Sequence, residues 1–120
     1  MLFDFIFKRR KNRKREFKYD FLIEVSSMSD IPKDNLGRSI YIVGNNNHFK
    51  WVVFDCPGEH KKRIEVNLMK NRKPNWLYEI NNNKISLSPS VAVDSTDCDC
   101  HFWLKNNIAY KAYYTWEKNK

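Results

Sequence analysis

The sequence predicts an all-β fold, a small antiparallel sandwich or rolled sheet with little or no helix. Short segments of alternating apolar and polar residues recur along the chain, and asparagine, glycine and proline separate them. No window keeps the 3.6-residue period of an amphipathic helix. Two short pairs of cysteine and histidine stand at predicted strand ends, and they add a zinc-ribbon-like pair of knuckles to the prediction.

Residues 1–19 are predicted to form a flexible basic arm. The net charge of the chain is +8; residues 1–18 hold eight basic and two acidic side chains, 8 − 2 = +6, which leaves 14 − 12 = +2 for the rest. The charge therefore belongs to the arm, and charge blocks of this kind are usually solvated. The alternatives are a contact with an anionic membrane surface or with a nucleic-acid backbone. The side chains that would make either contact are Lys8, Arg9, Arg10, Lys11, Arg13, Lys14 and Arg15.

Residues 20–116 are predicted to form a single β domain, followed by a C-terminal tail over residues 117–120. Apolar and polar residues alternate in most of its strands, as Ile64 and Val66 do with Glu65, and this indicates one buried and one wet face. The predicted strands are residues 21–25, 40–43, 51–54, 64–68, 76–80, 84–88, 91–93, 101–104 and 108–116.

The connections between these strands carry the residues that favour turns. Residues 26–37 contain Pro32 and are predicted to be a loop. Asparagine and glycine tolerate a positive φ, so the asparagine-rich segments 44–47, 81–83 and 105–107 predict three hairpins.

Cys56, His60, Cys98 and His101 are the predicted metal ligands. They form one CxxxH pair and one CxxH pair. Thiolate and imidazole are ligands that Zn²⁺ prefers, and four protein ligands make a closed, structural site. Cys100 is the reserve ligand in this prediction. Strand alternation would send Cys100 and His101 to opposite faces, so the CxxH pair fits a zinc site only where it forms a turn.

The chain has three cysteines, an odd number that excludes a complete set of internal disulfides. Reduced thiols point to the cytoplasm. The apolar N-terminus precedes its basic run, the reverse of a secretory signal, and no segment is long and apolar enough to span a bilayer.

Catalytic motifs are missing from the sequence, which favours a non-catalytic module. It contains no glycine-rich phosphate loop, zincin motif or serine elbow. Ser88 and Ser90 are interpreted as turn residues around Pro89. A thiol enzyme built on Cys100 and His101, or a zinc enzyme, is the weaker alternative, because adjacency in sequence does not create catalytic geometry.

Four blocks of sequence resemble an uncharacterised family of small bacterial and phage proteins, some encoded beside ubiquitin-like conjugation components. The resemblance covers about residues 29–110, and the family's knuckles look like CPCGCG and CxxHF. The blocks are Ser29-Asp30-Ile31-Pro32 leading into Ile40-Tyr41-Ile42-Val43, Phe54-Asp55-Cys56-Pro57, Leu87-Ser88-Pro89-Ser90, and Cys98-Asp99-Cys100-His101-Phe102-Trp103.

The resemblance implies zinc binding more than any reaction. Cys56 fits the family's first cysteine, and Cys98 with His101 fits its CxxH pair. Gly58 stands where the family has a second cysteine, and His60 stands where it has a third. The genes that lie beside those of some family members imply an accessory or recognition role in ubiquitin-like conjugation.

Two binding functions follow as hypotheses. The first is a zinc-stapled module that recognises a protein partner through a sheet edge or through exposed aromatics, although most of these rings are expected in the core. The second is a nucleic-acid-associated module in which the arm binds backbone and aromatic side chains stack on bases. The aromatic candidates are Trp76, Tyr78, Trp103 and Tyr110.

Overall fold

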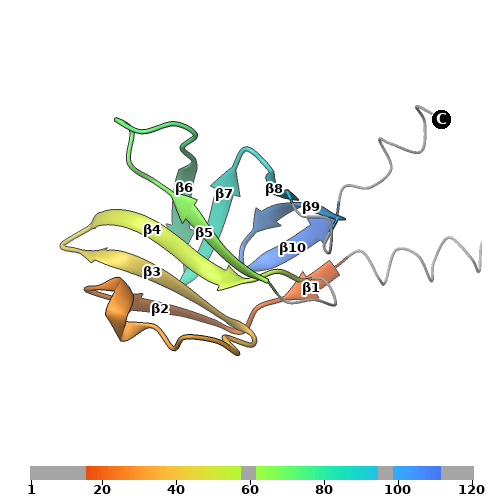
Figure 1. Ribbon diagram of the computed structural model, residues 1–120, viewed down its shortest axis with the longest axis horizontal. Coiled ribbons are helices and arrows are strands. Elements are labelled where there is room, and N and C mark those ends of the chain that lie inside the picture. Colours follow the sequence, from red (N-terminus) through yellow and green to blue (C-terminus); the bar gives the residue numbers. More distant parts are fainter. Residues whose placement is uncertain (1–15, 58–61, 95–98, 112–120) are drawn as a thin grey trace, which may run out of the picture.

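The computed structural model describes residues 16–57, 62–94 and 99–111, without the side chains of residues 93, 94, 99 and 100 (Figure 1). Ten strands lie in these residues and form two four-stranded sheets and one two-stranded sheet. Their bounds are β1 Glu16–Lys18, β2 Phe21–Val25, β3 Ser39–Asn45, β4 His48–Asp55, β5 Arg63–Asn67, β6 Leu77–Asn81, β7 Lys84–Ser88, β8 Val91–Asp94, β9 Asp99–Lys105 and β10 Ile108–Lys111.

The prediction of an all-β fold is confirmed. The described residues contain a single 3₁₀ turn, Met28–Asp30, and no α-helix. One detail of the prediction was wrong, because the sheets are not purely antiparallel: β2 pairs with β3 in parallel, with Phe21 opposite Ser39. A parallel pair needs a crossover connection, and residues 26–38 provide it.

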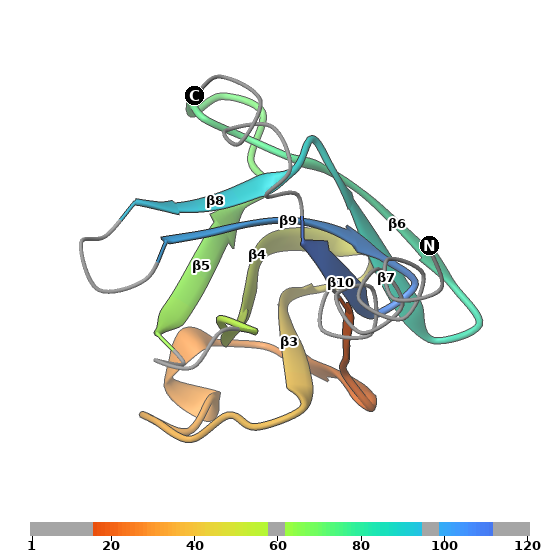
Figure 2. The same ribbon diagram turned by 90° about the vertical axis from the view of Figure 1, so that its right-hand side faces the viewer.

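The two larger sheets share one core. Their strand orders are β2-β3-β4-β5 and β1-β10-β9-β8, and Figure 2 shows β8 and β9 crossing over β4 and β5. Phe54 from β4 and Phe102 from β9 meet edge to face with ring centroids 6.0 Å apart. Tyr19, in the connection from β1 to β2, packs on Phe54 at 5.4 Å and donates from its hydroxyl to the carbonyl oxygen of Asp55 at 2.6 Å. Residues 16–19 of the predicted arm therefore belong to the domain.

The second face of the β2–β5 sheet is covered by the crossover, residues 26–38. Ile31 and Leu36 of the crossover pack on Val43 and Val53 in a second buried cluster. Asp55 is itself buried, and its Oδ2 accepts a hydrogen bond of 2.9 Å from the Leu36 N–H. The crossover is thus held to the sheet by both apolar packing and a buried polar bond.

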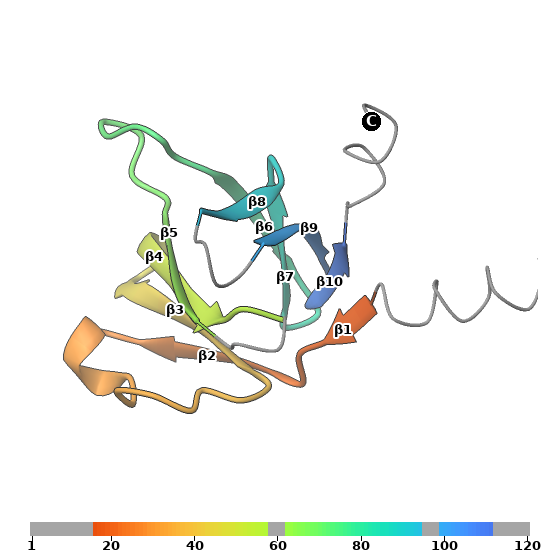
Figure 3. The ribbon, with the colours of Figure 1, turned by 45° about the vertical axis from the view of Figure 1, so that its right-hand side comes forward.

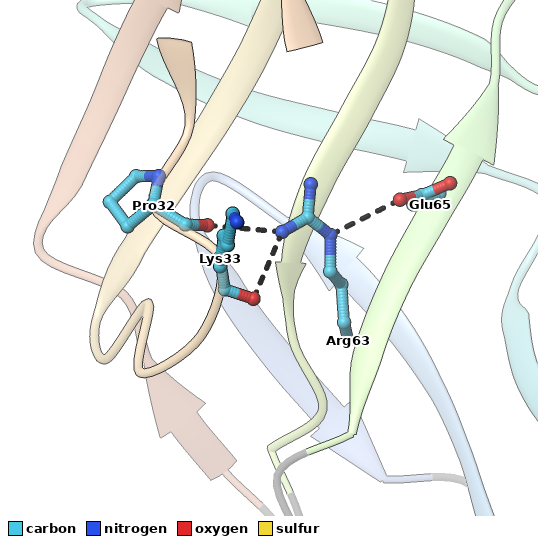
Figure 4. A network of polar contacts seen from close by, with 4 residues as sticks. All are labelled: Pro32, Lys33, Arg63 and Glu65. Carbon is cyan, nitrogen blue, oxygen red and sulfur yellow. Dashed lines mark hydrogen bonds and ion pairs between the residues drawn. The ribbon is translucent and has the colours of Figure 1, made fainter. Parts of the chain in front are cut away.

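Arg63 on β5 adds a polar strap to the same crossover (Figure 4). Its Nη1 donates to the carbonyl oxygens of Pro32 at 3.0 Å and Lys33 at 3.4 Å. Its Nε donates to Glu65 Oε2 at 3.1 Å, so the carboxylate fixes the plane of the guanidinium.

The three asparagine hairpins are present as predicted. Each has two successive asparagines with positive φ, for example 49° at Asn106 and 67° at Asn107. Asn107 also joins this hairpin to β7, because its Oδ1 accepts from the Ile85 N–H at 2.7 Å and its N–H donates to the Ile85 carbonyl at 2.9 Å. These two bonds anchor the β9–β10 hairpin on β7, so the β9–β10 and β6–β7 hairpins lie side by side (Figure 3).

Candidate active site

Ser90 lies in the bend between β7 and β8. Leu87 before the bend and Val91 after it are both buried in the main core, so the segment between them is fixed at its two ends. Trp76 holds the bend from the side, since its Nε1–H donates to the Ser90 carbonyl oxygen at 3.2 Å. Ser90 itself is half-buried, which leaves its hydroxyl at the edge of the packed interior.

His101 lies on β9 and faces away from the core. Phe102 and Leu104 are fully buried, whereas His101 is half-buried and Trp103 is 39% exposed. This is the two-residue alternation of a strand with one buried face. The pairing of β8 with β9 puts Ala92 opposite His101 and Val91 opposite Phe102, so the start of β8 runs beside His101.

The Ser90 hydroxyl and the His101 imidazole form a hydrogen bond. The distance from Oγ to Nε2 is 2.7 Å. When Nε2 carries no proton it accepts from the hydroxyl, and this is the arrangement in which an imidazole activates a serine as a nucleophile. Ser90 comes from the Ser-Pro-Ser bend and His101 comes from β9, and the two residues are eleven positions apart in the chain. Their arrangement is that of a serine hydrolase nucleophile and its base.

The pair is a dyad within the side chains that the structure describes. None of those side chains is an acid bonded to the second ring nitrogen of His101. The same part of the chain has no buried side-chain nitrogen or oxygen without a partner. The proton transfer in the attack step takes place between hydroxyl and imidazole, and a third group acts by orienting the imidazole and stabilising its charged form.

The predicted metal ligands fall mostly outside the described residues. His60 and Cys98 lie there entirely, and so does the side chain of the reserve ligand Cys100. Cys56 follows β4 and is 1% exposed in the main core, where its N–H donates to the Lys62 carbonyl oxygen at 2.7 Å. No group of three or more histidine, cysteine, aspartate or glutamate side chains comes together among the residues whose placement is given. Zinc stays a prediction.

The basic arm from Lys8 to Arg15 and the tail at 117–120 also lie outside the described residues, so their predicted contacts are untested. The expectation that most candidate aromatics belong to the core was wrong for two of them. Tyr78 is 37% exposed on β6, where every residue is exposed, and Trp103 is 39% exposed on the outward side of β9. In the described part of the chain, no helix has the length and apolar character to cross a membrane.

The interpretation of Ser90 as a turn residue missed its chemistry. It does lie in a turn, but the turn carries it to His101. A signal was present in the sequence: Ser-Pro-Ser and His-Phe-Trp are two of the four blocks that carry the family resemblance, and the second contains a histidine. What the sequence does not state is that the two blocks meet across β8 and β9.

A serine hydroxyl bonded to an imidazole, here on a small β fold, is the pairing of nucleophile and base that serine hydrolases use. The family model described as "Bacterial ubiquitination-like system serine protease (BubE)" matches residues 27–111, more than half of the chain. The chain belongs to this family. No curated protein and no solved structure matches it. The hypothesis of a non-catalytic module was therefore wrong, and the predicted link to a bacterial ubiquitin-like system is confirmed.

Proposed function

We propose that this protein is a serine protease acting in a bacterial ubiquitin-like conjugation system, with Ser90 as nucleophile and His101 as general base. The observation that carries the proposal is the 2.7 Å hydrogen bond between Ser90 Oγ and His101 Nε2. The family match supports it independently, because the matched range 27–111 contains both residues. Membership in a ubiquitination-like system also supports a protein substrate.

The reaction follows from this contact. Ser90 Oγ attacks the carbonyl carbon of an amide bond while His101 Nε2 removes the hydroxyl proton. The resulting imidazolium gives that proton to the leaving amine as the carbon–nitrogen bond breaks, and an acyl group stays on Ser90. Water then gives its proton to His101, attacks the acyl carbon and releases the acid, and Ser90 recovers its proton. Both residues end as they began.

The fold keeps the two groups in reach of each other through the pairing of β8 with β9. Ser90 is fixed by the Trp76 bond to its carbonyl and by buried neighbours, and His101 is fixed by the β8–β9 pairing. Such preorganisation matters because a misplacement of about 1 Å can cost a hundredfold in rate.

Ser90→Ala and His101→Ala test the assignment. Each variant should lower the hydrolysis of p-nitrophenyl acetate by about 10³-fold or more, with an unchanged melting temperature. Diisopropyl fluorophosphate should form an adduct that peptide mass mapping places on Ser90. Ser39→Ala and His48→Ala are matched controls, because both residues lie in the other sheet, and they should keep full activity. An adduct on another serine, or full activity in Ser90→Ala, would refute the proposal.

We propose zinc as a separate, structural component, held by Cys56, His60, Cys98 and the reserve ligand Cys100. Cys56 suits this role because its thiol is buried just after the end of β4, and its N–H donates to the Lys62 carbonyl oxygen. Ser90 engages Nε2 of His101, which favours Cys100 over His101 as the fourth ligand. Zinc per chain, measured on purified protein, should fall in Cys56→Ala and Cys100→Ala and stay constant in His101→Ala. An equal loss of zinc in all three variants would show that His101 is a zinc ligand.

A further inference from the structure

Three of the large apolar side chains on the surface line a single groove. Five such side chains are exposed in the described residues, and Leu77, Tyr78 and Trp103 lie together along a hollow of about 650 Å³. Leu77 is 62% exposed, a degree of exposure that contributes nothing to the packing of the core. Exposed apolar residues scattered singly need no explanation, but a cluster around a hollow indicates a binding site.

The groove begins beside the Ser90–His101 dyad. Ser88 lines it and lies two positions before Ser90, and Trp103 lines it and lies two positions after His101. His101, Trp103 and Lys105 share the outer face of β9, since Phe102 and Leu104 between them are buried. A chain that leaves the dyad along this face therefore enters the groove directly.

The two walls of the groove are fixed relative to each other. One wall is the β6–β7 hairpin and the other is β9 with the turn after it. The Asn106 N–H donates to Ser86 Oγ at 2.9 Å, and both residues line the groove. The two bonds between Asn107 and Ile85 lie behind this contact. The groove is thus formed before anything binds, and a preformed site loses less entropy on binding.

The charges of the lining balance each other. Glu79 and Lys105 are its charged side chains, one of each sign, and the remaining lining is aromatic, aliphatic, hydroxyl or amide. A ligand with a large net charge gains no net electrostatic attraction from this lining. An apolar side chain gains the burial of its own surface against Trp103 and Leu77.

We propose that this groove binds the substrate segment next to the scissile bond, as an extended chain with an apolar side chain on Trp103. This inference rests on the proposed function of Ser90 and His101. An extended chain advances about 3.3 Å per residue, as β9 does. A substrate laid along β9 therefore puts its second residue from the scissile bond at the level of Trp103 and its fourth at the level of Lys105.

The test uses two probes with the full chain. One probe is a set of internally quenched octapeptides in which one position at a time is fixed, and the other is p-nitrophenyl acetate, which is too small to reach the groove. Trp103→Ala should lower kcat/KM for the preferred peptides by about tenfold or more, mainly through KM, and should abolish a preference for apolar residues near the second position. Turnover of the acetate should change by less than about twofold.

Phe21→Ala is the matched control, because Phe21 is 60% exposed but lies on β2 in the other sheet. Leu77→Ala is a second groove variant in case the tryptophan change disturbs folding. The inference is overturned if Trp103→Ala and Phe21→Ala cleave the peptides alike, if Trp103→Ala slows both probes equally, or if no peptide is cleaved while the acetate is. The proposed function fails in a different way, when Ser90→Ala turns over both probes like the parent.

Discussion

The two four-stranded sheets of this protein differ in how many of their faces are covered. The β2–β5 sheet packs on the shared core with one face, and the crossover 26–38 covers the other through Ile31 and Leu36. The β1-β10-β9-β8 sheet buries Phe102 and Leu104 toward the core, but its opposite face carries half-buried His101 and exposed Trp103. A sheet covered on both faces contributes stability, whereas a sheet with one open face has room for a substrate.

Strand β9 shows this division within residues 101–105. Phe102 and Leu104 are buried in the core, whereas His101, Trp103 and Lys105 lie on the face of the candidate active site, and one backbone pairing sets both orientations. The comparison separates changes that unfold the protein from changes that inactivate it. The variants below test that separation, from the largest expected effect to the smallest.

Phe54→Ala should have the largest effect on stability, about 3–5 kcal/mol in the free energy of unfolding. Phe54 is fully buried and contacts the rings of Tyr19 and Phe102, so its removal leaves a cavity between the sheets. Urea denaturation followed by tryptophan fluorescence measures the loss. Phe21→Ala should stay within about 0.5 kcal/mol, because its ring is exposed. Equal costs for the two variants would contradict the shared core.

Asp55→Ala should cost about 1–3 kcal/mol, because it leaves the buried Leu36 N–H without its acceptor. Asp55→Asn keeps an oxygen at this position and should cost less. Both variants should hydrolyse p-nitrophenyl acetate at the parent rate below their melting temperatures, since the bond lies in the covered sheet. A large loss of activity in folded Asp55→Asn would show that the two sheets are coupled.

Arg63→Ala should have the smallest effect, about 0–1 kcal/mol. Its guanidinium straps the crossover through the carbonyls of Pro32 and Lys33, but its side chain is 28% exposed and water replaces part of each bond. Thermal unfolding is the measurement, with Glu65→Ala as the partner variant. A cost as large as that of Asp55→Ala would mean that the strap holds the crossover more strongly than the buried bond does.

Much of the fold was predictable because its signals are local. The asparagine pairs specify the hairpins through their tolerance of positive φ, as at Asn106 and Asn107, and alternation marks the buried faces, as in β5. The parallel pairing of β2 with β3 was missed, because nothing local shows where the chain returns after a loop. Tyr19 was placed in a flexible arm for a similar reason: the rings that bury it come from β1 and β4.

The sequence by itself determined where the chain turns, including the Ser-Pro-Ser bend, and the alternation of buried and exposed residues in strands such as β5. The tertiary structure alone decided that Ser90 and His101 meet, because β7, β8 and β9 must pack in a particular register before a hydroxyl and an imidazole eleven positions apart lie 2.7 Å from each other. Propensity acts over a few residues, but a catalytic distance is set by the packing of whole strands.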